Sequence, residues 1–115
     1  MQASGEKRTE PGIRSGLLPA DPGRIRDLVT ATGFFNAEEV GIAGELAEEW
    51  LARGPASGYS FLLAEADGTL LGYACFGRIP GTVSSWDLYW IVVAPEWQGR
   101  GLGQALMART ELAVR

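Results

Sequence analysis

The stretch Gln98-Gly99-Arg100-Gly101-Leu102-Gly103 decides the fold of this chain. It follows the apolar run 88–93 and precedes a segment, 105–114, whose apolar residues recur at helical spacing. This order predicts a strand, a glycine-rich turn and the start of a helix. The three glycines permit positive φ and lack Cβ atoms, so main-chain N–H groups can converge on one point at the positive end of the helix dipole. Such a point favours a phosphate group.

Two well-known phosphate-binding motifs do not fit these residues. A P-loop closes with Gly-Lys-Ser/Thr, whereas Gly103 is followed by Gln104 and Ala105. A dinucleotide-binding fingerprint needs Gly-x-Gly-x-x-Gly, and its last glycine is missing whichever glycine is taken as the first. The turn therefore predicts neither nucleotide hydrolysis nor dinucleotide binding.

The motif that remains is Gln-x-x-Gly-x-Gly, formed by Gln98, Gly101 and Gly103 after a Val-Ala-Pro sequence. Here the chain resembles the GCN5-related N-acetyltransferase (GNAT) family, most clearly over residues 87–112. The resemblance implies an enzyme that transfers an acetyl group from its co-substrate acetyl-CoA to a primary amine of a small molecule or protein by direct attack. The alternatives are a catalytically incomplete module that binds acetyl-CoA without turnover, and a structural domain whose glycines only form a tight turn.

In that family the turn amides hold the pyrophosphate of acetyl-CoA, and the strand before the turn binds the pantetheine arm through its main chain. The resemblance implies that Gln98, Gly99, Arg100, Gly101, Leu102 and Gly103 bind pyrophosphate, and that Ile91, Val92 and Val93 bind pantetheine and the thioester. The charge of Arg100 suits a phosphate partner, with simple solvation as the alternative. A main-chain N–H near Val92 or Val93 is expected to polarise the thioester carbonyl.

Acetyl transfer needs a neutral amine, so a carboxylate near the thioester is a sensible general base. Asp87 is the candidate, because it has the spacing from Gln98 at which several histone-type members of the family carry a glutamate; the alternative is a solvated residue at the strand entrance. Alternation along the strand places Asp87 and Tyr89 on one face together with Ile91 and Val93. The Tyr89 hydroxyl is expected to bind substrate or water, with ordinary packing as the alternative.

The N-terminal half predicts one strand followed by two helices. Residues 13–18 form the strand, and Asp21 is expected to cap the first helix with Pro22 at its first position. Asn36 and Glu39 have the spacing of a capping box, which predicts the start of the second helix.

Phe34 and Phe35 lie between the two predicted helices, in the segment that often lines the acceptor pocket of this family. The resemblance therefore implies that they bind substrate, and core packing is the alternative.

The second half predicts a hairpin, a further strand and a helix. Apolar runs at 59–65 and 69–76 flank Asp67-Gly68, which is typical of a tight hairpin turn. A strand over 86–93 then leads into the glycine turn. Together these elements predict an α/β (α+β) fold, with a GNAT-like mixed, mainly antiparallel sheet flanked by helices.

Composition limits the function further. The formal net charge is −4 and the pI is about 4.8, which disfavours nucleic acid as a partner and suits a cationic substrate. Cys75 is the only cysteine and histidine is absent, which excludes an intrachain disulfide and histidine-based triads, and we expect no metal. Cys75 is expected to be a buried core thiol. No leader or membrane-spanning stretch is recognisable, so a cytoplasmic location without membrane contact is expected.

Residues 1–11 are predicted to be a disordered tail and 12–115 a single acetyltransferase-like domain. In the family, a strand, a helix and a hairpin follow the helix after the glycine turn, and a tyrosine there often protonates the leaving thiolate. The resemblance therefore implies that the C-terminal part of the fold is absent, and it leaves the proton donor unassigned. An open edge at the strand 86–93 predicts a homo-oligomer or completion by another chain. A shortened form of a longer enzyme is the alternative.

Overall fold

The computed structural model describes residues 11–78 and 86–114. Its elements are β2 (Gly12–Ser15), α1 (Asp21–Thr32), α2 (Ala37–Arg53), the 3₁₀ turn η1 (Gly54–Ser57), β3 (Tyr59–Ala66), β4 (Thr69–Arg78), β5 (Trp86–Val93), the 3₁₀ turn η2 (Pro95–Trp97) and α3 (Leu102–Ala113). This order confirms the predicted succession of elements. The predicted tail lies outside the described residues except for Pro11.

The strands form one antiparallel sheet in the order β2-β3-β4-β5. The β3–β4 turn has positive φ at both central residues, 54° at Asp67 and 78° at Gly68, which confirms the predicted hairpin. β2 is shorter than predicted, because the chain leaves the sheet at Gly16, where φ is 84°. Among the described strands β5 is an edge strand, with β4 on one side only.

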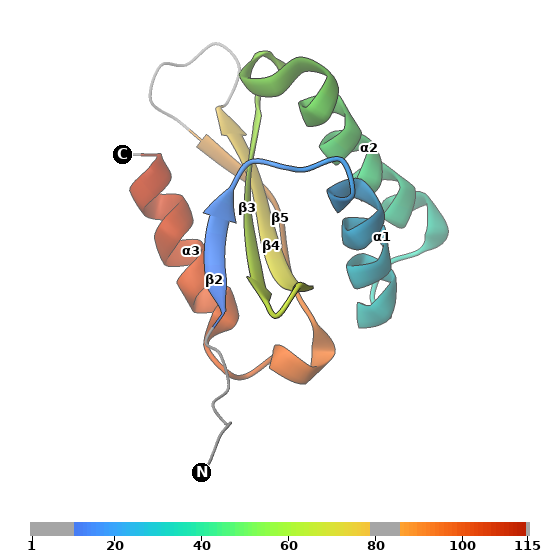
Figure 1. Ribbon diagram of the computed structural model, residues 1–115, viewed down its shortest axis with the longest axis vertical. Coiled ribbons are helices and arrows are strands. Elements are labelled where there is room, and N and C mark those ends of the chain that lie inside the picture. The colour runs from blue at the N-terminus through green and yellow to red at the C-terminus, as the bar shows by residue number, and fades with distance from the viewer. Residues whose placement is uncertain (1–10, 79–85, 115) are drawn as a thin grey trace.

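The helices cover the two faces of this sheet, giving three layers (Figure 1). Helices α1 and α2 pack on one face, over a core that includes Ile25, Phe61 and Tyr73. Helix α3 packs on the other face, where Leu102 and Leu106 meet strand residues such as Phe76. Within the part of the chain that is described, no helix has both the length and the apolar character needed to cross a bilayer.

The start of α2 follows the sequence pattern. The Asn36 side chain accepts a hydrogen bond from the Glu39 N–H at 2.8 Å, and the Glu39 carboxylate accepts one from the Asn36 N–H at 2.9 Å. This reciprocal pair is the predicted capping box, and it fixes the turn between α1 and α2.

The start of α1 differs from the prediction. Ala20 is the N-cap, Asp21 is the first helical residue, and no side chain caps the helix. The Asp21 side chain is fully buried and accepts a hydrogen bond from the Leu18 N–H at 2.7 Å. It therefore holds the β2–α1 connection rather than the end of the helix.

Asp21 is also the centre of an ion network that joins β2, α1 and β3. Arg14 contacts the Asp21 carboxylate at 2.9 Å and Glu65 at 3.0 Å, and Arg24 contacts the same two acids at 2.8 and 3.0 Å. Two guanidinium groups thus alternate with two carboxylates, which satisfies the buried charge of Asp21.

Candidate functional site

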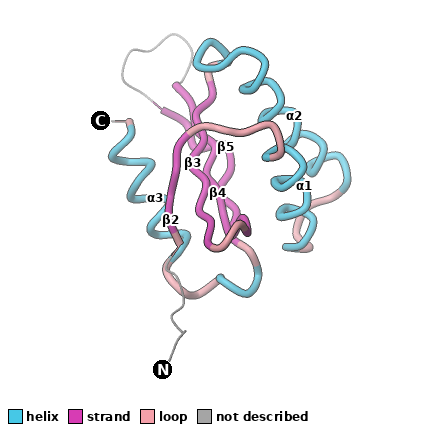
Figure 2. The backbone as a smooth tube through the Cα atoms, viewed as in Figure 1, coloured by secondary structure: helices cyan, strands magenta, loops and turns pink. Residues whose placement is uncertain are grey.

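The candidate site is the connection between β5 and α3, which passes beneath the end of the sheet through the short turn η2 (Figure 2). Gly99 and Gly101 have φ of 79° and 85°, in the left-handed region that favours glycine. A Cβ atom at either glycine would meet nothing within 4 Å, so the space beside both is open.

The first turn of α3 presents unpaired donors. Gly101 is the N-cap and supplies no side chain, and the first hydrogen bond of the helix runs from the Ala105 N–H to the Gly101 carbonyl at 3.0 Å. Among the described residues, the N–H groups of Leu102, Gly103 and Gln104 find no acceptor. These three donors and the positive end of the dipole of α3 form an anion-binding geometry.

The side chains of the glycine turn hold the turn in place. The Gln98 side-chain amide donates to the Val93 carbonyl at 3.0 Å, which ties the turn to the last residue of β5. The guanidinium carbon of Arg100 lies 4.9 Å from the centre of the Trp97 ring, and Trp97 packs against both cores. Arg100 is exposed, so its charge is available beside the unpaired donors.

The free edge of β5 presents the main chain of alternate residues. The Ala94 N–H donates to the Leu71 carbonyl on the β4 side at 2.8 Å, so the peptide groups of Val92 face the same way. Those of Ile91 and Val93 face the free edge. Of the three residues predicted to bind pantetheine, Val92 thus differs: its main chain faces β4 and its side chain is 4% exposed.

A β-bulge interrupts the pairing of β5 with β4 at Tyr89. Trp90 pairs with Cys75 and Leu88 pairs with Phe76, so Tyr89 is an extra residue with no partner of its own. Because paired residues share a face, Trp90 lies on the α1/α2 face with Cys75, and Leu88 lies on the α3 face with Phe76.

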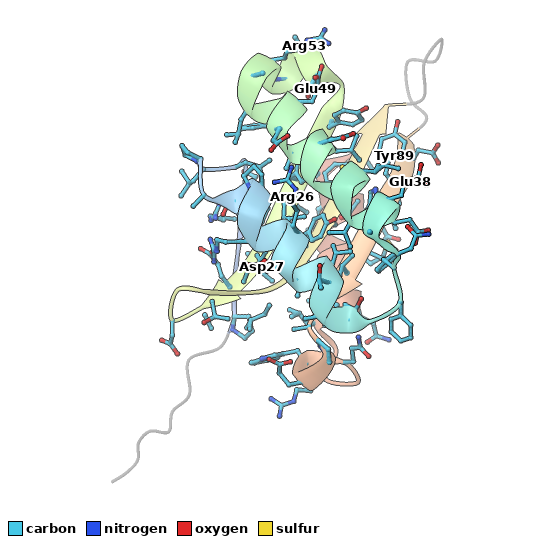
Figure 3. The ribbon with its side chains drawn as sticks, turned by 90° about the vertical axis from the view of Figure 1, so that its right-hand side faces the viewer. Arg26, Asp27, Glu38, Glu49, Arg53 and Tyr89 are labelled. Atoms are coloured by element: carbon cyan, nitrogen blue, oxygen red, sulfur yellow. The ribbon has the colours of Figure 1, made fainter. Side chains whose placement is uncertain are left out.

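The bulge corrects the predicted alternation. The ring of Tyr89 meets that of Tyr59 edge-to-face, with 5.7 Å between ring centres. Tyr89 therefore lies on the α1/α2 face, which is turned to the viewer in Figure 3. Ile91 and Val93 pack instead against the core under α3. The prediction that they share a face with Tyr89 is wrong, because the extra residue shifts the alternation by one position.

Asp87 and Tyr89, predicted as catalytic residues, lie close together at the start of β5. Asp87 is exposed, and Tyr89 is 40% exposed. Partial burial raises the pKa of the Tyr89 hydroxyl, and the negative charge of Asp87 raises it further. Tyr89 therefore keeps its proton at neutral pH, and its hydroxyl can donate a hydrogen bond.

Phe34 and Phe35 lie in different environments. Phe34 is 76% exposed in the α1–α2 connection. Phe35 is partly buried and packs on Trp90, with 5.2 Å between ring centres and 50° between ring planes. Trp90 and Tyr59 were not among the predicted site residues; their aromatic character was visible in the sequence, but their place beside Tyr89 and Phe35 depends on strand pairing.

Cys75 is fully buried in β4, which confirms the predicted core thiol. Burial raises the pKa of its thiol to about 12, so the thiolate is scarce at neutral pH. Cys75 has no access to a substrate and is not a nucleophile.

Comparison with known proteins places this geometry in a family. The sequence matches the acetyltransferase (GNAT) family over residues 25–113. No curated protein matches the chain.

Three solved structures illustrate the likeness. A crystal structure from Desulfovibrio desulfuricans, assigned to the GNAT family, is 46% identical with a TM-score of 0.89, over 91% of this chain and 66% of that one. A GNAT acetyltransferase from Brucella melitensis in complex with acetyl-CoA is 26% identical with a TM-score of 0.65, over 91% and 68%. Diaminobutyrate acetyltransferase from Paenibacillus lautus, in complex with L-2,4-diaminobutyric acid and coenzyme A, is 19% identical with a TM-score of 0.68, over 89% and 57%.

The chain thus spans between about half and about two thirds of the length of these three proteins. The family match covers most of the chain and includes the glycine turn, β5 and α3. This chain belongs to the GNAT acetyltransferase family.

Proposed function

We propose that this protein transfers an acetyl group from acetyl-CoA to the primary amine of a small molecule or protein by direct attack. The observation that carries the proposal is the unpaired first turn of α3 beside the free edge of β5. The Brucella melitensis relative, which binds acetyl-CoA, supports the choice of co-substrate.

In this proposal the glycine turn binds the pyrophosphate of acetyl-CoA. The N–H groups of Leu102 and Gly103 donate to phosphate oxygens, together with those of Gly99 and Gly101. The N–H groups of Gln98 and Arg100 instead donate to the Pro95 and Trp97 carbonyls, at 3.3 and 3.4 Å, and close the turn. Arg100 adds a charge-assisted contact, because Trp97 already holds its guanidinium beside the turn. The side chain of Gln98 positions the turn through the Val93 carbonyl.

The main chain of Ile91 and Val93 binds the pantetheine arm as a neighbouring strand would. Of the two amides expected to polarise the thioester carbonyl, that of Val93 faces the free edge and is the better donor. Val92 contributes through its buried side chain, which keeps β5 fixed on the core.

Asp87 is the proposed general base, acting directly or through a water molecule. The amine nitrogen forms a bond to the acetyl carbonyl carbon as the carbon–sulfur bond breaks, and the sulfur leaves as a thiolate. Asp87 removes the proton that the amine loses. Tyr89 donates a hydrogen bond to substrate or water from its protonated hydroxyl.

The acceptor is proposed to approach from the α1/α2 face, where Phe34 and Phe35 border the site. The Paenibacillus lautus neighbour binds an amine acceptor, which agrees with this class of substrate. The acidic composition favours an amine over a nucleic acid, and we place the protein in the cytoplasm.

Thermal unfolding with acetyl-CoA tests binding, and thiol release across a panel of amines tests turnover. Ligand at about 100 times its Kd should add about 2.7 kcal/mol to the free energy of unfolding. The absence of any shift would reject the proposal. A shift without thiol release for any amine would leave a module that binds acetyl-CoA without turnover.

The role of Asp87 makes a sharper prediction. Asp87→Asn should lower kcat by about 10²–10³-fold, because the amide cannot accept the proton, while acetyl-CoA affinity stays near wild type. Glu111→Gln, an exposed acid on α3, is the control with the same change of charge. If Asp87→Asn has the same kcat as Glu111→Gln, Asp87 is not the general base.

A further inference from the structure

The β-bulge at Tyr89 brings four aromatic side chains into one row on the α1/α2 face. The ring centres of Tyr59 and Tyr89 lie 5.7 Å apart. The ring centres of Phe35 and Trp90, the residue after Tyr89, lie 5.2 Å apart. In a regular strand Tyr89 and Trp90 would point to opposite faces. The extra residue places both on the same face, so β5 joins the two ring pairs into an aromatic row, Tyr59-Tyr89-Trp90-Phe35.

Part of this row is open to solvent. Tyr89 is 40% exposed, and Tyr59, Trp90 and Phe35 are partly buried. Phe34, next to Phe35, is 76% exposed and adds apolar surface at that end. Gly77 makes room for the Tyr89 ring, since a Cβ atom there would lie 3.0 Å from Cε2 of Tyr89. The rings thus form a packed surface with one accessible side.

The carboxylate of Asp87 lies at the opposite end of the row. Asp87 is exposed and near enough to Tyr89 to raise its hydroxyl pKa. No ion pair joins Asp87 to any described side chain; Arg14, Arg24, Arg26 and Arg53 all pair with other acids. A carboxylate beside aromatic rings suits an ammonium group attached to an apolar body.

We propose that the acceptor is a primary amine bearing an aromatic group, with its ring on the aromatic row and its nitrogen at Asp87. This inference rests on the proposed function and names the substrate class of the same site. Highly polar polyamines and amino sugars fit less well, because they would have to bury hydroxyl or ammonium groups against rings that offer few acceptors.

The test compares amines that differ in the body attached to nitrogen, with the full chain and acetyl-CoA. 2-Phenylethylamine should have a kcat/KM at least about tenfold above those of ethanolamine and putrescine, in line with one added aromatic contact. In Tyr89→Ala this ratio should fall to about one, while Tyr89→Phe, which keeps the ring, should retain it. Leu112→Ala removes an exposed apolar side chain from α3 and should leave the ratio unchanged.

The possible results separate this inference from the proposed function. Equal or faster turnover of ethanolamine or putrescine would overturn the acceptor class and leave the acetyltransferase proposal intact. If no amine is turned over, saturation-transfer NMR tests whether 2-phenylethylamine binds to the CoA-bound protein. Binding that Tyr89→Ala abolishes would support the acceptor class, and the absence of binding would overturn it.

Discussion

Gly101 and Gly103 belong to the same turn but differ in what a side chain would meet. Gly101 has φ of 85°, whereas Gly103 lies in the first turn of α3 without positive φ, and a Cβ atom there would lie 3.6 Å from Cγ2 of Val93. Gly101→Ala should cost about 1–2 kcal/mol of stability and weaken acetyl-CoA binding, because the left-handed conformation is strained for alanine. Gly103→Ala should keep or raise stability, by up to about 1 kcal/mol.

Urea unfolding and calorimetric titration with CoA measure both effects. Equal losses of stability in the two variants would contradict the proposed difference in backbone strain. A loss of CoA affinity in Gly103→Ala at full stability would show instead that the ligand approaches this Cβ position closely.

Among the described residues, Asp21 is the one charged residue that is buried. It is fully buried and receives hydrogen bonds from the Leu18 N–H, Arg14 and Arg24. Asp21→Asn should cost about 3–5 kcal/mol, because it removes one of the two carboxylates that Arg14 and Arg24 share and leaves Glu65 to balance both guanidinium groups. Glu48→Gln breaks an exposed pair with Arg26 and should cost less than about 1 kcal/mol.

The same network gives a pH dependence. Burial alone would raise the pKa of Asp21, but the Leu18 N–H and Arg14 hold it below the ordinary value of 3.8. The hydrogen bond from Arg14 lowers the pKa of Glu65 below 4.5. Both carboxylates therefore contribute stability that is complete above their ordinary pKa values and lost as the pH falls through the lower folded values.

Thermal melts between about pH 6 and pH 2 test this linkage. The melting temperature of the wild type should fall steeply below about pH 4.5, and that of Asp21→Asn should fall less. Parallel curves for the two proteins would mean that Asp21 does not carry the acid sensitivity.

Helix α3 packs closely on the sheet because β4 has a glycine beneath it. A Cβ atom at Gly72 would lie 2.9 Å from the Val92 carbonyl oxygen and 3.2 Å from Cδ1 of Leu106. Gly72→Ala should therefore cost about 1–3 kcal/mol and shift the start of α3, with weaker CoA binding as the consequence. Gly41→Ala, in α2 with nothing within 4 Å of the added carbon, is the control and should be neutral or stabilising. A Gly72→Ala protein as stable as Gly41→Ala would show that α3 can move away without loss.

Elements set by local chemistry were predictable from the sequence. The Asn36–Glu39 capping box and the Asp67-Gly68 turn are decided by neighbouring residues, and both are confirmed. Asp21 was not predictable in the same way. An aspartate before a helix is typical of a cap, and only the fold brings Arg14, Arg24 and Glu65 to it.

In the candidate site, too, the locally determined features could be predicted and those that depend on strand pairing could not. The strand, glycine turn and helix over 86–113 follow from sequence spacing, and the structure confirms these elements. The bulge at Tyr89 arises from register with β4, which no pattern within β5 reveals. The faces of Tyr89 and Ile91 could therefore not be predicted, and the ligand contacts assigned to residues 98–103 stay predictions.

For the whole molecule, the free edge of β5 has two competing uses. We propose that a second copy of the chain pairs with this edge when acetyl-CoA is absent, because Leu88 to Val93 carry no charge or proline to discourage strand pairing. The same main-chain groups of Ile91 and Val93 are proposed to bind pantetheine. Ligand and self-association should therefore oppose each other.

Sedimentation velocity at micromolar concentration should show a dimer or a monomer–dimer mixture, and saturating CoA should shift it towards monomer. Ile91→Lys, which adds a charge beside the edge on the α3 face, should weaken association. Leu112→Lys adds the same charge at an exposed position on α3, away from the edge, and should associate as wild type does. A monomer under all conditions would refute pairing through β5. A dimer that CoA does not affect would place the interface on another surface and leave the free edge to the ligand alone.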